Sequence, residues 1–94
     1  MGQLDDAERS YRNALRHDPR NPYFLGGLAA FLYRHGRPEA AFGSYLTLLE
    51  VEWRNKHELG IRTAIAALRE LGQKCGLSDE VVSDRIRGID GSLG

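Results

Sequence analysis

The sequence predicts an all-α protein of about five helices joined by short turns. Apolar residues recur at three- and four-residue spacing through most of the chain, which is the spacing of one helix face. No run of β-branched or aromatic residues alternates with polar ones, and valine occurs only at positions 51, 81 and 82. Proline, glycine and asparagine divide the pattern at regular intervals. We therefore expect helices and no sheet.

The size and composition of the chain exclude several classes of protein and of binding partner. The 94 residues carry thirteen Lys+Arg against thirteen Asp+Glu, so the chain lacks the charge excess typical of proteins that bind nucleic acid or anionic membranes. The longest apolar stretch, residues 24–32, is too short to span a bilayer, and no signal segment precedes it. A single cysteine, Cys75, excludes an internal disulfide. These features favour a soluble cytoplasmic domain with no nucleic-acid partner and no membrane insertion.

The first two helices are delimited by two Pro-containing turns. Asp18-Pro19 ends the first helix, and Asn21-Pro22 begins the second, with Asn21 as the cap and Pro22 where its missing N–H has no cost. Gly36 ends the second helix. The expected core positions share one face in each helix: Leu4, Ala7, Tyr11, Ala14 and Leu15 in the first, and Leu25, Leu28, Ala29 and Leu32 in the second.

The other three helices have equally local signals. Arg37-Pro38-Glu39 opens a helix that should run to residues 51–53, before the polar turn 54–57. A fourth helix is expected over 58–71, with Gly72 as its left-handed C-cap. Ser78 is the expected N-cap of the last helix. The buried stripes are predicted to be Ile61, Ala64, Ile65, Leu68 and Leu71 in the fourth helix, and Val81, Val82, Ile86 and Ile89 in the fifth.

The chain also contains an internal repeat. A shift of 34 residues superimposes turn, small, aromatic and large apolar residues of the first and third helices: Gly2 on Gly36, Ala7 on Ala41, Tyr11 on Tyr45, and Leu15 on Leu49. At this offset the chain resembles the tetratricopeptide repeat family, whose units are 34-residue helical hairpins. The complete unit carries the likeness at Leu25, Leu28, Ala29, Leu32, Gly36, Ala41, Tyr45 and Leu48, with Leu48 replacing the usual small residue.

The resemblance implies a right-handed solenoid of antiparallel helical hairpins within one domain, 1–94. Residues 2–21 correspond to the second helix of a truncated repeat, 22–55 to a full repeat, and 56–91 to a degenerate or capping helical pair. The likeness weakens after about residue 52, because Trp53 stands where the family has proline.

Two weaker likenesses indicate an alternative role. The C-terminal region of some bacterial thioredoxin-like chaperones has a spacing of Arg, Leu-Gly and Arg similar to that of Arg62, Leu71-Gly72 and Arg85. Residues 24–29 resemble helical-repeat chaperones of bacterial type III secretion. Both are analogies of fold. On this alternative interpretation the chain is a helical appendage of a larger enzyme or of a thioredoxin-like chaperone.

The sequence contains no pattern typical of catalysis, cofactor binding or metal binding. Histidines 17, 35 and 57 lie near expected helix ends, and neither an HExxH motif nor a second cysteine accompanies them. Gly-rich phosphate-binding motifs are absent from the sequence as well. Ser78 is better explained as a helix cap than as a nucleophile. The Cys75 thiol, next to Lys74, could be somewhat activated, but an ordinary single cysteine is the favoured interpretation. We predict a protein that is not an enzyme and has no cofactor.

The resemblance places the first helix of each unit on an inner, concave surface that binds a protein or peptide. Where a subset of the family clamps a terminal carboxylate with Lys and Asn, this chain has Gly26 and Ala30. An extended or helical segment held by apolar and aromatic contacts therefore fits better. Alternatively, Tyr23 and Tyr33 only cover neighbouring turns. The candidate groove residues are Tyr23, Gly26, Ala30, Tyr33 and Arg34 in one unit and His57, Gly60 and Ala64 in the next.

The N-terminal edge provides a second candidate surface. Leu4, Tyr11 and Leu15 belong to a helix without the preceding helix of its own unit, so the following helix alone cannot bury all three. We expect either that the chain is part of a longer protein or that this edge forms a two-fold homodimer. The nearby arginines at 9, 12, 16 and 20 are expected to form a solvated, salt-bridged surface.

Overall fold

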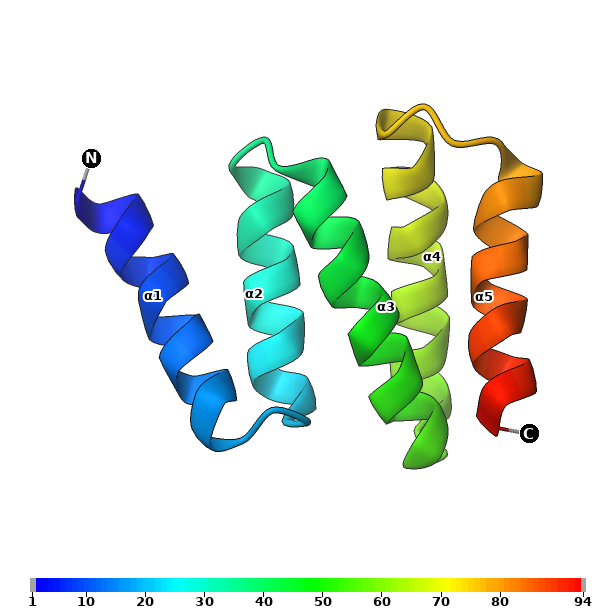
Figure 1. Cartoon of the computed structure of the whole chain (residues 1–94), viewed down its shortest axis with the longest axis horizontal. Coiled ribbons are helices and arrows are strands. Elements are labelled where there is room, and N and C mark those ends of the chain that lie inside the picture. The colour runs from blue at the N-terminus through cyan, green and yellow to red at the C-terminus, as the bar shows by residue number, and fades with distance from the viewer. Residues whose placement is uncertain (1, 94) are drawn as a thin grey trace.

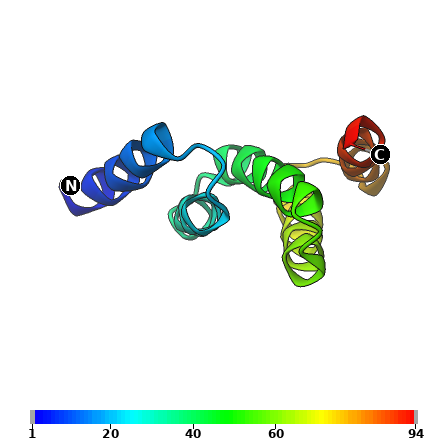
Figure 2. The same ribbon diagram turned by 90° about the horizontal axis from the view of Figure 1, so that it is seen from below.

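The computed structural model describes the backbone of residues 2–93 and the side chains of residues 6–89. Five helices occupy the chain: α1 (Gly2–His17), α2 (Pro22–Arg34), α3 (Pro38–Arg54), α4 (Glu58–Lys74) and α5 (Asp79–Leu93) (Figure 1). Residues 2–93 contain no strand, which confirms the predicted all-α class. Successive helices run antiparallel, and α2 and α4 lie on one side of the layer that contains α1, α3 and α5 (Figure 2).

The turn between α1 and α2 forms as the sequence predicts. The Asn21 side-chain oxygen accepts hydrogen bonds from the backbone N–H groups of Tyr23, at 2.9 Å, and Phe24, at 3.3 Å. Pro22 occupies the first helical position. At the other end of α2, Gly36 adopts a φ of +73°, and the Arg37 N–H donates to the Leu32 carbonyl at 3.0 Å. Both ends of α2 therefore have their backbone groups satisfied by local chemistry.

The predicted end of α4 is wrong by one turn. The helix continues through Gly72 to Lys74, and the left-handed residue is Gly76, with a φ of +76°. The Leu77 N–H closes the end by donating to the Gly72 carbonyl at 2.8 Å. Gly72 itself is buried, and a Cβ there would overlap the Val82 side chain. Glycine is used at position 72 because α5 crosses α4 there at close range, not because the helix ends.

The start of α5 agrees with the prediction, and its buried face agrees in part. The Ser78 hydroxyl oxygen accepts a hydrogen bond from the Val81 N–H at 3.3 Å. Val82 and Ile86 are buried and Ile89 is half-buried. Val81 is 39% exposed, contrary to the expectation that it belongs to the core. The helix contacts its neighbours along a narrower stripe than the apolar residues of its sequence indicate.

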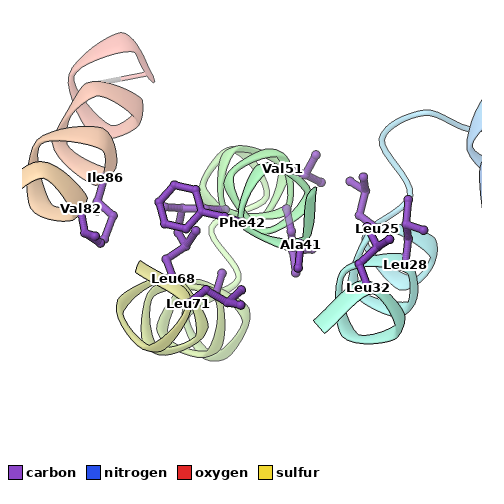
Figure 3. Close-up of a cluster of buried hydrophobic side chains, with 13 residues drawn as sticks. Leu25, Leu28, Leu32, Ala41, Phe42, Val51, Leu68, Leu71, Val82 and Ile86 are labelled. Carbon is purple, nitrogen blue, oxygen red and sulfur yellow. The ribbon is translucent and has the colours of Figure 1, made fainter. Parts of the chain in front are cut away.

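The core lies between α2, α3 and α4, with α5 packed against α3 and α4 (Figure 3). The predicted stripe of α2 is confirmed, since Leu25, Leu28, Ala29 and Leu32 are all buried. Ala41 is completely buried in α3, so the two helices of the hairpin approach closely at this position. The largest fully buried side chains are Leu32, Leu49, Leu68 and Leu71.

Helix α1 attaches to this core mainly through Tyr11. The Tyr11 ring lies against Gly27, where a Cβ would come within 2.5 Å of the ring, and 6.4 Å from the Phe31 ring centroid. Leu15 is half-buried and also packs against the core. No side chain between residues 6 and 17 is buried. Glycine at position 27 therefore lets a bulky aromatic residue hold α1 to α2.

Helix α4 does not repeat the orientation of α2. Leu59, one repeat after the buried Leu25, is 71% exposed. The next three positions of that stripe, Arg62, Thr63 and Ala66, are also exposed, whereas their counterparts in α2 are buried. Arg62 and Thr63 explain the difference, because a guanidinium and a hydroxyl would be costly in a helix interface. The repeat thus loses its apolar face at α4.

Candidate protein-binding surface

The C-terminal ends of α2 and α4 lie side by side and share a polar and aromatic cluster. The Tyr33 hydroxyl of α2 donates a hydrogen bond to the Glu70 carboxylate of α4 at 2.5 Å. The Lys74 ammonium lies 5.5 Å from the centroid of the same ring. The Tyr33 side chain therefore contacts both an anionic and a cationic side chain of α4.

Tyr45 of α3 and Arg34 of α2 complete this group. Burial raises the pKa of the Tyr45 phenol, Arg34 opposes that effect, and Glu70 adds to it. The hydrogen bond to Glu70, together with its desolvation and charge, raises the pKa of Tyr33. Both phenols therefore stay protonated and able to donate hydrogen bonds at neutral pH. We call the group the tyrosine cluster: Tyr33, Arg34, Tyr45, Glu70 and Lys74.

Two small groove candidates lie on α2 between its ends. Gly26 and Ala30 are half-buried. A Cβ at Gly26 would lie 3.7 Å from the Leu48 side chain, which is an ordinary contact. The packing therefore does not require glycine at position 26. Because Gly26 and Ala30 are small, no long side chain projects from α2 beside Tyr33.

The candidates from the next unit have a different environment. Glu52 is only 5% exposed, and its carboxylate oxygen lies 2.6 Å from the Nδ1 atom of the exposed His57. A Cβ at Gly60 would overlap the same carboxylate. His57 and Gly60 thus accommodate a buried acidic group at the α3–α4 turn.

Ala64 requires a correction. Its exposed fraction is 0%, so it offers no surface to a ligand and belongs to the α3–α4 core. The groove assignment is wrong because it transferred the orientation of α2 to α4. The buried stripe predicted for α4, which also contains Ala64, is confirmed.

Tyr23 lies at the other end of α2 from Tyr33 and belongs to a different surface. It is 80% exposed and lines a hollow of about 360 Å³ between α1 and α2. We call this the edge hollow; its lining residues are Ala7, Ser10, Tyr11, Ala14, Tyr23 and Phe24. Of the predicted self-association residues, Tyr11 lines the hollow, Leu15 packs toward the core, and the Leu4 side chain lies outside the described residues.

Arginines surround a separate hollow between α1 and the start of α3. Arg12 and Arg37 contact the two carboxylate oxygens of Glu8 at 2.8 and 2.6 Å. The hydrogen bond from Arg12 lowers the pKa of Glu8. Arg20 reaches Glu50, at 3.6 Å, from the following turn. Of the four arginines predicted to form a solvated, salt-bridged surface, Arg12 and Arg20 therefore take part in ion pairs. Arg37, outside that prediction, adds a third.

Sequence reasoning missed Glu70, Lys74 and the buried Glu52. Glu70 and Lys74 read as ordinary exposed residues of an amphipathic helix, and only the side-by-side placement of α2 and α4 joins them to Tyr33. Burial and the charge of Glu39 raise the pKa of the Cys75 thiol, which favours an ordinary cysteine over an activated one. Among residues with described side chains, no group of three or more His, Cys, Asp or Glu could hold a metal ion. No helix of the described chain is long and apolar enough to cross a membrane.

Antiparallel helices stacked in sequence order, with alternate helices sharing one face, define a helical-repeat protein. The model of the family described as "Tetratricopeptide repeat" matches residues 1–56, and the chain belongs to this family. Repeats of this family generally mediate protein–protein interactions. No curated protein and no solved structure matches the chain. The matched region ends at the turn before α4, the helix whose outward stripe becomes polar.

Proposed function

We propose that the chain is a non-enzymatic scaffold that binds a protein segment on the face shared by α2 and α4. The observation that carries this proposal is the Tyr33–Glu70 hydrogen bond with Lys74 over the same ring. It places an aromatic ring of α2 and two charged groups of α4 on one surface, next to the exposed Arg34. Tyrosine and arginine are the residue types most enriched at the energetic centres of protein interfaces.

The tyrosine cluster is more than a device that holds two helices together. The hydrogen bond from Tyr33 to Glu70 is exposed, and an exposed polar contact contributes little to stability. Arg34 is exposed beside it with no ion-pair partner among the residues with described side chains. A binding partner would desolvate these groups and strengthen their interactions.

The chemistry of the cluster also defines the segment that it fits. Arg34 and Lys74 provide two positive charges against the single carboxylate of Glu70. The rings of Tyr33 and Tyr45 offer apolar surface beside them, and Gly26 and Ala30 keep the adjacent part of α2 low. The expected ligand is a segment with an apolar or aromatic side chain followed by an acidic one.

The test begins with a displayed library of random peptides selected on the purified chain. Peptides that bind are then measured by calorimetry against Tyr33→Ala, Arg34→Ala and Lys74→Ala variants. Each substitution is expected to raise Kd about tenfold or more, which corresponds to roughly 1.4 kcal/mol of binding free energy. The melting temperatures of Arg34→Ala and Lys74→Ala should stay close to that of the parent, because both side chains are exposed. Tyr33→Ala also removes a contact with the core, so its melting temperature is measured alongside its affinity.

Arg62→Ala is the matched control, since Arg62 is an exposed arginine of α4 that pairs only with Glu58. It should bind the selected peptides as the parent does. Peptides whose affinity is the same for all four variants would place binding elsewhere and overturn the proposal. Failure to select any peptide above the background of the Tyr33→Ala variant would overturn it as well.

A further inference from the structure

The edge hollow leaves apolar side chains exposed to solvent. It lies between α1 and α2 and is lined mainly by alanine and aromatic side chains. Tyr23, at 80%, has the highest exposure among the large apolar side chains between residues 6 and 89, and its ring packs edge-on against Phe24 at 5.7 Å. An exposed apolar surface of this kind is typical of a site where another element packs.

The internal repeat shows what kind of element covers this face. One repeat later, the counterparts of Ala7, Tyr11 and Ala14 are Ala41, Tyr45 and Leu48 on α3. Ala41 and Leu48 are buried, and Tyr45 is half-buried, because α2 packs along that side of α3. The α1 face is thus built to receive a helix, and residues 6–89 supply none.

We propose that the missing helix comes from a second copy of the chain, so that two α1 helices pack antiparallel across a two-fold axis. Ala7, Ser10 and Ala14 share one face of α1 at three- and four-residue spacing. In an antiparallel pair with Ala7 opposite Ala14, these small side chains let the two helices approach closely. Tyr23 of each copy then fills the edge hollow of the other. This inference is independent of the proposed groove on α2 and α4.

An acidic side chain and a histidine beside this face favour the antiparallel arrangement. Asp6 lies near the start of α1 and His17 at its end, both exposed and both on the same flank of the small residues. A two-fold axis near Ser10 brings Asp6 of one copy toward His17 of the other. The opposed dipoles of the two helices add to this match, because each positive end lies beside a negative one. A parallel pair would instead place Asp6 beside Asp6 and His17 beside His17.

The first test measures mass against concentration. Sedimentation of the intact chain from about 1 µM to 1 mM should show a monomer–dimer equilibrium. Tyr23→Asp and Ala14→Glu should each raise the dimer Kd tenfold or more, with little change in the melting temperature of the dilute monomer. Ala66→Glu is the matched control, because Ala66 is an exposed alanine of α4, away from the hollow. It should dimerise as the parent does.

The second test uses disulfide crosslinking to probe how the two α1 helices are arranged in the dimer. In a Cys75→Ser background, Ser10→Cys places a thiol near the two-fold axis, within reach of its symmetry mate. Mild oxidation should then yield a covalent dimer at concentrations where dimer forms, and Ala66→Cys in the same background should not.

Three outcomes would overturn the proposal. The first is a chain that stays monomeric at 1 mM. The second is dimerisation unaffected by both edge variants or equal crosslinking of the two cysteine variants. The third is a series of assemblies that grows with concentration, because head-to-tail stacking, not a closed two-fold pair, would produce it.

Discussion

At the residue scale, two glycines inside helices have opposite surroundings. Gly72 lies where a Cβ would overlap Val82, whereas a Cβ at Gly43 of α3 would meet nothing within 4 Å. Both positions are helical, so helix propensity favours alanine at each by about 1 kcal/mol. The two positions differ because α5 crosses α4 close to Gly72, whereas no element of the described chain packs against Gly43.

Gly72→Ala is therefore expected to destabilise the protein by about 1–3 kcal/mol, since overpacking outweighs the gain in propensity. Gly43→Ala should stabilise it by roughly 0.5–1 kcal/mol. Urea denaturation of the two variants measures both changes. Stabilisation by both alanines would show that α5 does not pack closely on α4.

A second residue-scale prediction concerns the buried carboxylate. Glu52 is 5% exposed and its contacting partner is His57, at 2.6 Å. His57→Ala removes that partner and should cost about 1–3 kcal/mol of unfolding free energy, because a buried charge is left poorly satisfied. Arg62→Ala, which breaks an exposed pair, should cost less than about 0.5 kcal/mol. Similar losses for the two variants, measured by denaturant titration, would argue against a structural role for His57.

At the element scale, α1 depends on few attachments. Besides Tyr11 and Leu15, it is joined to the start of α3 through Glu8, which Arg37 contacts at 2.6 Å. Glu8 also accepts a hydrogen bond from Arg12 of its own helix, so one carboxylate links two elements. Because these groups are partly exposed, the contribution is modest and sensitive to salt.

This link predicts a pH dependence. The pKa of Glu8 in the folded protein is below its ordinary value of 4.5, mainly because of the Arg12 hydrogen bond. The stabilisation is therefore present above about pH 4.5 and is lost as the pH falls through the lowered pKa. The stability difference between the parent and Glu8→Gln should shrink over that range, and 1 M NaCl should reduce it at pH 7. A difference that grows on acidification would contradict the assignment.

At the scale of the whole molecule, the repeat stops within the structure itself. Leu25 and Leu59 are the same residue type, 34 positions apart, yet one is 5% exposed and the other 71% exposed. Leu25→Asp should unfold the protein or destabilise it by several kcal/mol, because it buries a charge. Leu59→Asp should change stability by less than about 0.5 kcal/mol. Comparable effects in thermal denaturation would mean that α4 resumes the repeat.

Local chemistry made much of this fold predictable. The Asn21-Pro22 start, the Gly36 end and the buried stripe of α2 follow from short-range rules of capping and periodicity. The buried stripe of α4 also follows from periodicity, since Ala64, Leu68 and Leu71 are buried as predicted. Its departure from the orientation of α2 did not follow, because Leu59 and Ala64 lie on different faces of that helix and both are apolar. Choosing among its faces depends on how α3 and α5 pack. For the same reason the candidate surface was only partly found: Tyr33 and Arg34 were identified, but their partners on α4 were not.

The thin attachment of α1 has a consequence for local unfolding. Since no side chain from 6 to 17 is buried, α1 can detach without opening the core of α2, α3 and α4. Amide hydrogens of α1 should then exchange with solvent deuterium well before those of α3, through an opening much less costly than global unfolding. If two copies pair through α1, its exchange should slow as protein concentration rises, while that of the central helices stays the same. The amide exchange rate of α1 would therefore measure how often this helix detaches from the core.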